Sequence, residues 1–141
     1  MAKEHDEDAG GADFMEEICA HFERHYGASE IVMHEIMSDE LHIDVFPIPP
    51  SERWPCWTLH TTGMSERAMD VPPEMADDDE DTSAMQFAEM MIQLPPDWPV
   101  LEEDREKAAK TYWPIEWLKR AARLPNDMET WLGMGHTVQF S

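Results

Sequence analysis

The sequence predicts an α+β fold, in which a mainly antiparallel sheet of three to five strands packs against an N-terminal helix and two or three C-terminal helices. Strand-like segments cluster in the first two-thirds of the chain and helical patterns in the last third, an order that argues against alternating βαβ units. The 141 residues suffice for one domain with its own core. We expect an acidic, flexible N-terminus over residues 1–12 and a folded domain over residues 13–141.

The N-terminal helix is predicted over residues 14–25. Asp13 is a suitable N-cap, with Glu16 three residues later as in a capping box. Phe14, Ile18 and Phe22 then repeat every four residues, which places them on one face of a helix. Gly27 would end the helix. Residues 30–37 (EIVMHEIM) are predicted to form a first strand, followed by a turn over residues 38–40.

The central stretch, LHIDVFPIPPSERWPCWTLHTTGM, predicts two antiparallel strands over residues 41–48 and 56–62. In the first of them Leu41, Ile43 and Val45 alternate with His42, Asp44 and Phe46, and this period of two places one set on each face of a strand. The connection is too long for a two-residue hairpin turn. Because proline cannot donate a ladder hydrogen bond, we expect both strands to stop at the prolines of this connection: Pro47, Pro49, Pro50 and Pro55.

The remainder of the chain alternates loops with regular segments. Residues 65–84 show no periodicity and predict a surface loop, with an acidic run at Asp77–Asp81. Residues 85–94 predict another strand. Residues 102–111 predict a charged helix, and residues 114–124 a second helix with an apolar stripe of Trp117, Leu118, Ala121 and Ala122, closed by Pro125. A short helical turn is expected over residues 126–131 and a last strand over residues 137–140.

Charge restricts the possible partners. There are 31 Asp and Glu residues against 10 Lys and Arg, which gives a net charge of −21. Such a chain repels nucleic acids and anionic membranes, because binding them requires cationic side chains. It attracts basic proteins instead, and the alternative is that acidity serves only solubility. No apolar run is long enough to span a membrane, and MAKEHDEDAGGAD is no signal peptide, so we expect a cytoplasmic protein with Cys19 and Cys56 reduced.

Candidate chemistry is sparse. His21 and His25 have the spacing of zinc ligands on one helix face, but no HExxH motif or third ligand accompanies them. His42 and Asp44 share one strand face, and His60 and Thr62 share a face of the next strand, so a polar cluster forms if the registers match. Without a nucleophile motif, we favour a satisfied polar network over an active site. We therefore expect no catalytic residues, no metal and no cofactor.

The six tryptophans have two interpretations. Most of them are expected in the core, because small domains bury their aromatic residues first. Trp54 and Trp98 lie beside prolines and are candidates for exposed anchors that bind a partner. The Asp77–Asp81 run is either a solvated loop or a contact surface for a basic protein.

Five segments together resemble the suppressor of fused domain family in its bacterial form: HIDVFPIPP, WTLHTTGMSERAM, AEMMIQLPPDWP, YWPIEWLKRAARLP and TWLGMGHTV. The order and the spacing of the chain agree with that family over residues 30–138. The resemblance implies a mixed α/β domain that binds proteins and has no catalytic activity. Animal members restrain a transcription factor, and bacterial members are proposed to be immunity proteins of polymorphic toxin systems. Bacterial relatives usually continue past the GHT motif, so we expect the family's C-terminal segment to be absent and an edge strand to be open.

The candidate partner-binding residues combine family positions with the acidic run: Asp44, Thr61, Thr62, Gly63, Met64, Trp98, Trp131, His136, Asp77, Asp78 and Asp79. Glycines and prolines at other family positions are equally suited to fixing turns: Pro95, Pro96, Gly133 and Gly135. The preferred hypothesis is an immunity-type antagonist that occludes a basic partner such as a toxin domain. One alternative is a regulatory scaffold that binds an extended peptide by strand addition, with homo-oligomers possible through the same open edge. A further alternative is a small metal-dependent hydrolase that uses His42, Asp44, His60 and His136.

Overall fold

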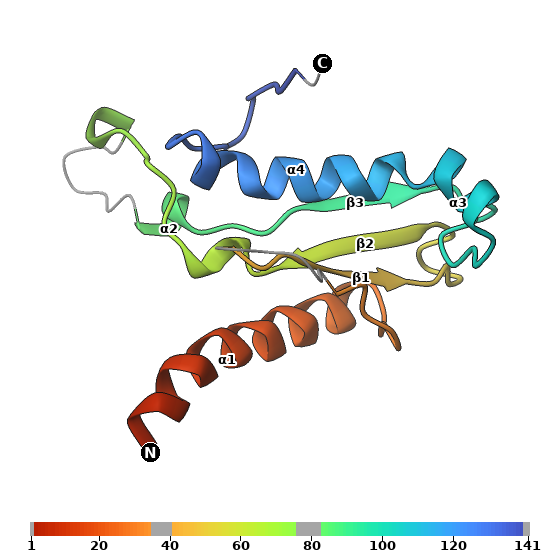
Figure 1. Ribbon diagram of the computed structural model, residues 1–141, viewed down its shortest axis with the longest axis horizontal. Helices are drawn as coiled ribbons and strands as arrows, with labels where there is room; N and C mark the ends of the chain where they lie inside the picture. Colours follow the sequence, from red (N-terminus) through yellow and green to blue (C-terminus); the bar gives the residue numbers. More distant parts are fainter. Residues whose placement is uncertain (1, 35–40, 76–82, 140–141) are drawn as a thin grey trace.

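The protein is represented by a computed structural model that describes residues 2–34, 41–75 and 83–139. Three antiparallel strands form one sheet in the order β1-β2-β3, with α1 and α4 on opposite sides of it (Figure 1). Between the ends of the chain lie, in order, α1 (Ala2–His25), β1 (Asp44–Ile48), β2 (Trp57–Thr62), 3-10 turns at Met64–Glu66 and Pro73–Met75, α2 (Ser83–Gln86), β3 (Met91–Leu94), α3 (Arg105–Thr111) and α4 (Trp113–Asp127). The predicted α+β arrangement is confirmed.

Both faces of the sheet are covered at its central strand, β2. Val45 lies opposite Thr61, and Leu59 lies opposite Ile92, so one face carries mostly apolar side chains. This face packs on α4 through a core cluster of Val45, Leu59, Val100, Ile115 and Leu118. On the other face His60 stacks against Phe22 of α1. Because both faces are covered, five consecutive residues of β2 are buried (Thr58–Thr62).

A second core cluster lies where the chain enters β1 and leaves β2. It consists of Leu41, Ile43, Met64, Met69, Val71 and Ala122. The predicted alternation is confirmed in part: Leu41, Ile43 and Val45 are buried and His42 is exposed, but Asp44, expected on the same face as His42, is buried as well. None of the helices in the described ranges is both long and apolar enough to cross a membrane.

The first strand ends at Ile48, as predicted, but it begins at Asp44 rather than at Leu41. Pro47 lies inside β1, opposite Leu59. β1 is an edge strand, and the backbone of Val45 bonds outward to Met33. Two residues later, the position of Pro47 also faces outward, where no N–H is required for pairing with β2. The carbonyl of Pro47 accepts a hydrogen bond from Ser29 Oγ at 2.6 Å instead.

The strand predicted over residues 30–37 is not found in its described part. Residues 30–34 contribute one isolated bridge, Met33 to Val45, and the rest of that prediction lies outside the described residues. Because Pro47 offers no N–H at the next outward position, the pairing cannot be extended along β1 on that side. The acidic run, which includes Asp77, Asp78 and Asp79, also lies outside the described residues.

Helix boundaries differ from the sequence-based expectations at three places. α1 begins at Ala2 rather than at Phe14, since Ala, Lys and Glu in the first segment favour helix. α3 begins at Arg105, because the carboxylate of Asp104 caps it by accepting from the N–H groups of Glu106 and Lys107. α4 continues through Pro125 to Asp127. In the last turn proline removes a single helical hydrogen bond, and its buried ring packs on the core.

Two predicted strands are also shorter or absent. The strand predicted over residues 85–94 is reduced to β3, and its first residues belong to the helical turn α2, consistent with the helix propensity of Met and Gln. Residues 137–139 form no strand, and Phe140 lies outside the described residues. The short helical turn expected over residues 126–131 is in part the end of α4.

Candidate functional site

The turn that follows β2 is held by the carboxylate of Glu89. Its Oε1 accepts a hydrogen bond from Thr61 Oγ1 at 2.7 Å and from the Met64 N–H at 3.3 Å. Its Oε2 accepts from the Ser65 N–H at 2.9 Å and from Ser65 Oγ at 2.6 Å. Hydrogen bonds to a carboxylate are stronger than neutral ones, so this network fixes the shape of the turn. Glu89 is not among the residues predicted from sequence, although a lone carboxylate inside the apolar segment AEMMI was a signal for it.

Gly63 is required for the same turn. Its φ of 104° lies in the region that L side chains rarely adopt. A Cβ atom at this position would overlap the backbone carbonyl oxygen of His42, so the two backbone segments can approach only because the side chain is absent. Thr61, Thr62 and Met64 are buried around it. These four candidate residues therefore shape the fold, and their contact with a partner stays a prediction.

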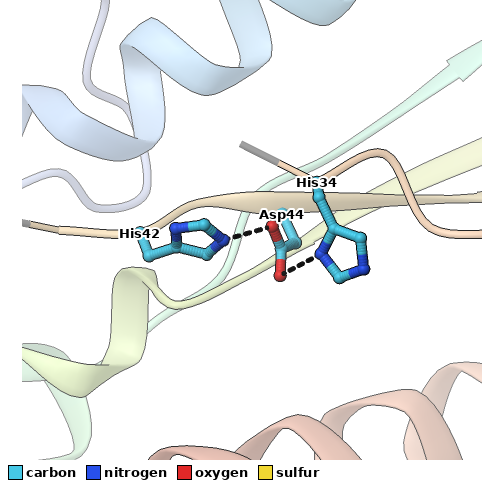
Figure 2. Close-up of side chains that lie close together, drawn as sticks. All are labelled: His34, His42 and Asp44. Atoms are coloured by element: carbon cyan, nitrogen blue, oxygen red, sulfur yellow. Dashed lines mark ion pairs between the residues drawn. The ribbon is translucent and has the colours of Figure 1, made fainter. Parts of the chain in front are cut away.

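Asp44 lies between two histidines at the start of β1. Its Oδ1 is 2.9 Å from His42 Nε2, and its Oδ2 is 3.4 Å from His34 Nδ1 (Figure 2). The residue is only 7% exposed, whereas both imidazoles reach solvent. His42 was expected here because it shares a strand face with Asp44. His34 was not expected here, because it reaches Asp44 only through the bridge between Met33 and Val45, which the sequence does not reveal.

His60 does not join this cluster, although the registers place Thr62 opposite Asp44. Its imidazole stacks on Phe22, with ring centroids 3.9 Å apart, and on Phe46 at 5.2 Å. Burial, together with a smaller effect of nearby His21, lowers the pKa of His60 to about 4, against the opposing effect of the 3.1 Å contact between its Nδ1 and the Thr61 carbonyl. A neutral imidazole packed between phenyl rings acts as a core residue.

Trp131 and His136 form a contact of their own. Their ring centroids are 4.4 Å apart in an edge arrangement, and the Gly133 N–H donates to His136 Nδ1 at 3.0 Å. Trp131 also packs against the second core cluster. His136 therefore closes the GMGH turn, and neither His136 nor His60 belongs to the group of ligand atoms formed around Asp44. The four residues proposed for a hydrolase are not gathered in one place.

The two tryptophans proposed as exposed anchors are half-buried and hydrogen-bonded. Trp54 Nε1 donates to the His25 carbonyl at 2.8 Å, and Trp98 Nε1 donates to the Thr111 carbonyl at 3.1 Å. Trp113 and Trp117 are more exposed, at 47% and 44%. Trp117 was expected in the apolar stripe of its helix, yet it lies partly in solvent beside Trp113, with ring centroids 5.3 Å apart.

The surface of the protein has two grooves of about 340 Å³ each. The first, here called the β3-edge groove, is lined by Ile92, Gln93, Leu94, Trp113, Pro114, Trp117, Leu118 and Ala121. Consecutive residues of β3 point to opposite faces, so a groove that touches three of them follows the edge of the strand. The second, here called the α1 groove, is lined by Glu17, Ile18, His21, Phe22 and Glu89.

Both cysteines are free thiols, as expected from the sequence. Burial, with a smaller contribution from Glu23, raises the pKa of the Cys19 thiol. A thiol held in its protonated form is a poor nucleophile, so Cys19 is not suited to nucleophilic catalysis.

Comparison with known proteins gives one match. A family model described as Suppressor of fused protein matches residues 39–141, which is well over half of the chain. No curated protein and no solved structure matches the chain.

Proposed function

Because this chain belongs to the suppressor of fused family, we propose that it is a protein-binding module that catalyses no reaction, and that its partner is a basic protein. The family points to a role in protein–protein interaction. The net charge of −21 supports a basic partner. In its most specific form, the proposal is an immunity-type antagonist that occludes a toxin domain, as the resemblance to bacterial members implies.

The α1 groove is the observation that carries this proposal. It combines the carboxylates of Glu17 and Glu89 with the apolar side chains of Ile18 and Phe22. A lysine or arginine of a partner would place its charged end near Glu17 and its aliphatic stem along Ile18 and Phe22. Glu89 already binds the turn after β2, so Glu17 is the carboxylate we assign to the partner.

The helix that borders this groove is itself strongly acidic. α1 carries Lys3 and Arg24 against eight acidic residues: Glu4, Asp6, Glu7, Asp8, Asp13, Glu16, Glu17 and Glu23. Charges of one sign on one element steer a basic partner toward it and raise the rate of association. If the partner is a nuclease, the exposed carboxylates of Glu16, Glu17 and Glu23 would occupy the lysines and arginines that otherwise hold nucleic acid. Inhibition then requires occlusion alone, without turnover.

We expect the affinity for such a partner to fall about tenfold or more as salt rises from low to several hundred millimolar, because exposed charges are screened. Glu17→Gln should weaken binding further at low salt, mostly through a slower association rate. The matched control is Glu103→Gln, an exposed carboxylate that lies outside the α1 groove. Biolayer interferometry with toxin domains encoded beside this gene measures both rates. Failure to capture any of them, together with failure to rescue growth on co-expression, would contradict the proposal.

A second candidate function is the binding of an extended peptide by strand addition, and the β3-edge groove favours it. Among the described residues β3 pairs only with β2, so its other edge presents backbone N–H and C=O groups. A peptide that pairs with this edge would place alternate side chains against Trp113 and Trp117. A second copy of the chain pairing through the same edge is the homo-oligomeric form of this interaction.

If the protein binds a peptide by strand addition, we expect Trp117→Ala to weaken the binding of overlapping peptides from the partner sequence by about tenfold or more, as for a buried aromatic anchor. Added salt should leave the affinity nearly unchanged, in contrast to the first mode. Met134→Ala removes an exposed apolar side chain outside the groove and serves as the control. Fluorescence polarisation gives the affinities, and light scattering detects a dimer. Equal effects of the two substitutions would exclude the β3-edge groove.

A further inference from the structure

We propose that His34, His42 and Asp44 bind a divalent transition-metal ion, and that Zn²⁺ fits them best. One ligand atom from each residue lies within 4.8 Å of the other two. The two imidazoles approach the Asp44 carboxylate from different sides (Figure 2). Among the residues that the structure describes, this is the one place where three or more such ligands gather.

The distances suit a zinc ion. Zn–N and Zn–O bonds of about 2.0–2.2 Å place adjacent ligand atoms of a tetrahedron about 3.3–3.6 Å apart. His34 Nδ1 lies 3.4 Å from Asp44 Oδ2, within this range, whereas His42 Nε2 lies 2.9 Å from the other oxygen, Oδ1, and must move away slightly to bind the same ion. The side chains of His34 and His42 are 63% and 49% exposed, so small rotations can complete the geometry.

The types of ligand atom favour zinc over harder ions. Two imidazole nitrogens and one carboxylate oxygen match the preferences of Zn²⁺, with water as the fourth ligand. Ca²⁺ and Mg²⁺ require mostly oxygen ligands, which this group does not offer. Each imidazole binds a metal through a nitrogen lone pair, so the ion replaces the proton that links that nitrogen to the carboxylate.

The fold builds this group from two separate segments. His42 and Asp44 are two residues apart and share one face of the extended chain, whereas His34 is held by the bridge between Met33 and Val45. Asp44 is nearly buried, and a buried carboxylate is stabilised by positive charge close to it. A metal ion would therefore bind the segment after α1 directly to β1. This role does not depend on partner binding at the α1 groove, which none of the three residues lines.

The test is to titrate the full-length, EDTA-treated protein with Zn²⁺ alone. Isothermal titration calorimetry measures the binding, and thermal unfolding measures its effect on the Tm. We expect one Zn²⁺ per chain with a Kd in the micromolar range or below, and a higher Tm when it is bound. His34→Gln and His42→Gln should each weaken binding more than about tenfold and abolish the Tm increase, since even residues that only orient metal ligands change affinity by about 10- to 100-fold. Both side chains are exposed, so these variants retain the fold even if Asp44→Asn does not.

The double variant His21→Gln/His25→Gln is the matched control. These histidines lie one helical turn apart on α1, with ring centroids 4.6 Å apart, and supply only two ligands. The control should bind Zn²⁺ as the wild type does. Loss of binding in the control, equal binding in His34→Gln and His42→Gln, or only weak multiple binding by surface carboxylates would each overturn the proposal. Co²⁺ gives a second readout, because its visible absorption is strong only in a four-coordinate site.

Discussion

Gly63→Ala is expected to destabilise the protein by at least about 3 kcal/mol, a large part of the stability of a small domain. The φ of 104° at Gly63 is unfavourable for alanine, and the added Cβ overlaps the backbone oxygen of His42. Backbone atoms cannot rotate away as a flexible side chain would. Either the turn after β2 shifts, which breaks the hydrogen bonds to Glu89, or the chain around His42 shifts. Chemical denaturation followed by circular dichroism measures the change.

Gly135→Ala is the matched control. Gly135 also has a positive φ, 85°, but no atom lies within 4 Å of the position that an alanine Cβ would take, so only the backbone penalty of about 1–2 kcal/mol applies. Comparison of the two variants separates the close approach from the conformational cost. If both variants lose the same stability, the contact between Gly63 and His42 is not what requires glycine.

The family motif TTGMS, which contains Gly63, has a structural role in this protein. Thr61 donates to Glu89 and accepts from the Met90 N–H, while Met64 packs in the second core cluster. These residues of the motif therefore have structural tasks in positioning one turn. That turn contacts Glu89, which also borders the α1 groove. The motif thus holds Glu89 in place, and Glu89 lines the α1 groove.

The sheet could be predicted from the sequence because its information is local. Alternation of Leu41, Ile43 and Val45 predicts a strand without knowledge of its neighbours, although of the three only Val45 lies within β1. The proline stop signals were only partly reliable: β1 ends at Ile48 as predicted, whereas α4 continues past Pro125. Pro47 is tolerated because β1 is an edge strand, and Pro125 because it lies in the last turn of a helix that packs on the core. Both facts depend on tertiary position, which proline content alone does not reveal.

The sites depend on contacts between distant segments, and this is why the sequence indicated them only in part. His42 and Asp44 were paired correctly from their spacing, but His34 required the bridge from Met33 to Val45. Glu89 reaches the turn after β2 because β3 pairs with β2. The grooves likewise combine a helix with a strand or a turn. Helical or strand periodicity in the sequence does not indicate which distant segments become neighbours in the fold.

His60 should make the stability of the protein depend on pH between about 6.5 and 4. Burial lowers its pKa from 6.5 to about 4 in the folded state, so the fold favours the neutral imidazole. Above pH 6.5 the residue is neutral in both states and has no effect. As the pH falls, the unfolded chain takes up a proton that the folded chain excludes, and the free energy of unfolding decreases by about 3 kcal/mol in total by pH 4.

The acidic residues also titrate in this range, so the contribution of His60 must be measured as a difference. His60→Phe keeps a planar ring between Phe22 and Phe46 but cannot be protonated. We expect urea denaturation at pH 7 and at pH 4.5 to show a smaller loss of stability for this variant than for the wild type, by about 2 kcal/mol. His25→Gln, an exposed histidine, should follow the wild-type profile. Parallel profiles of His60→Phe and the wild type would mean that α1 packs on the sheet without excluding a proton from His60, and the assignment of His60 to the core would fail.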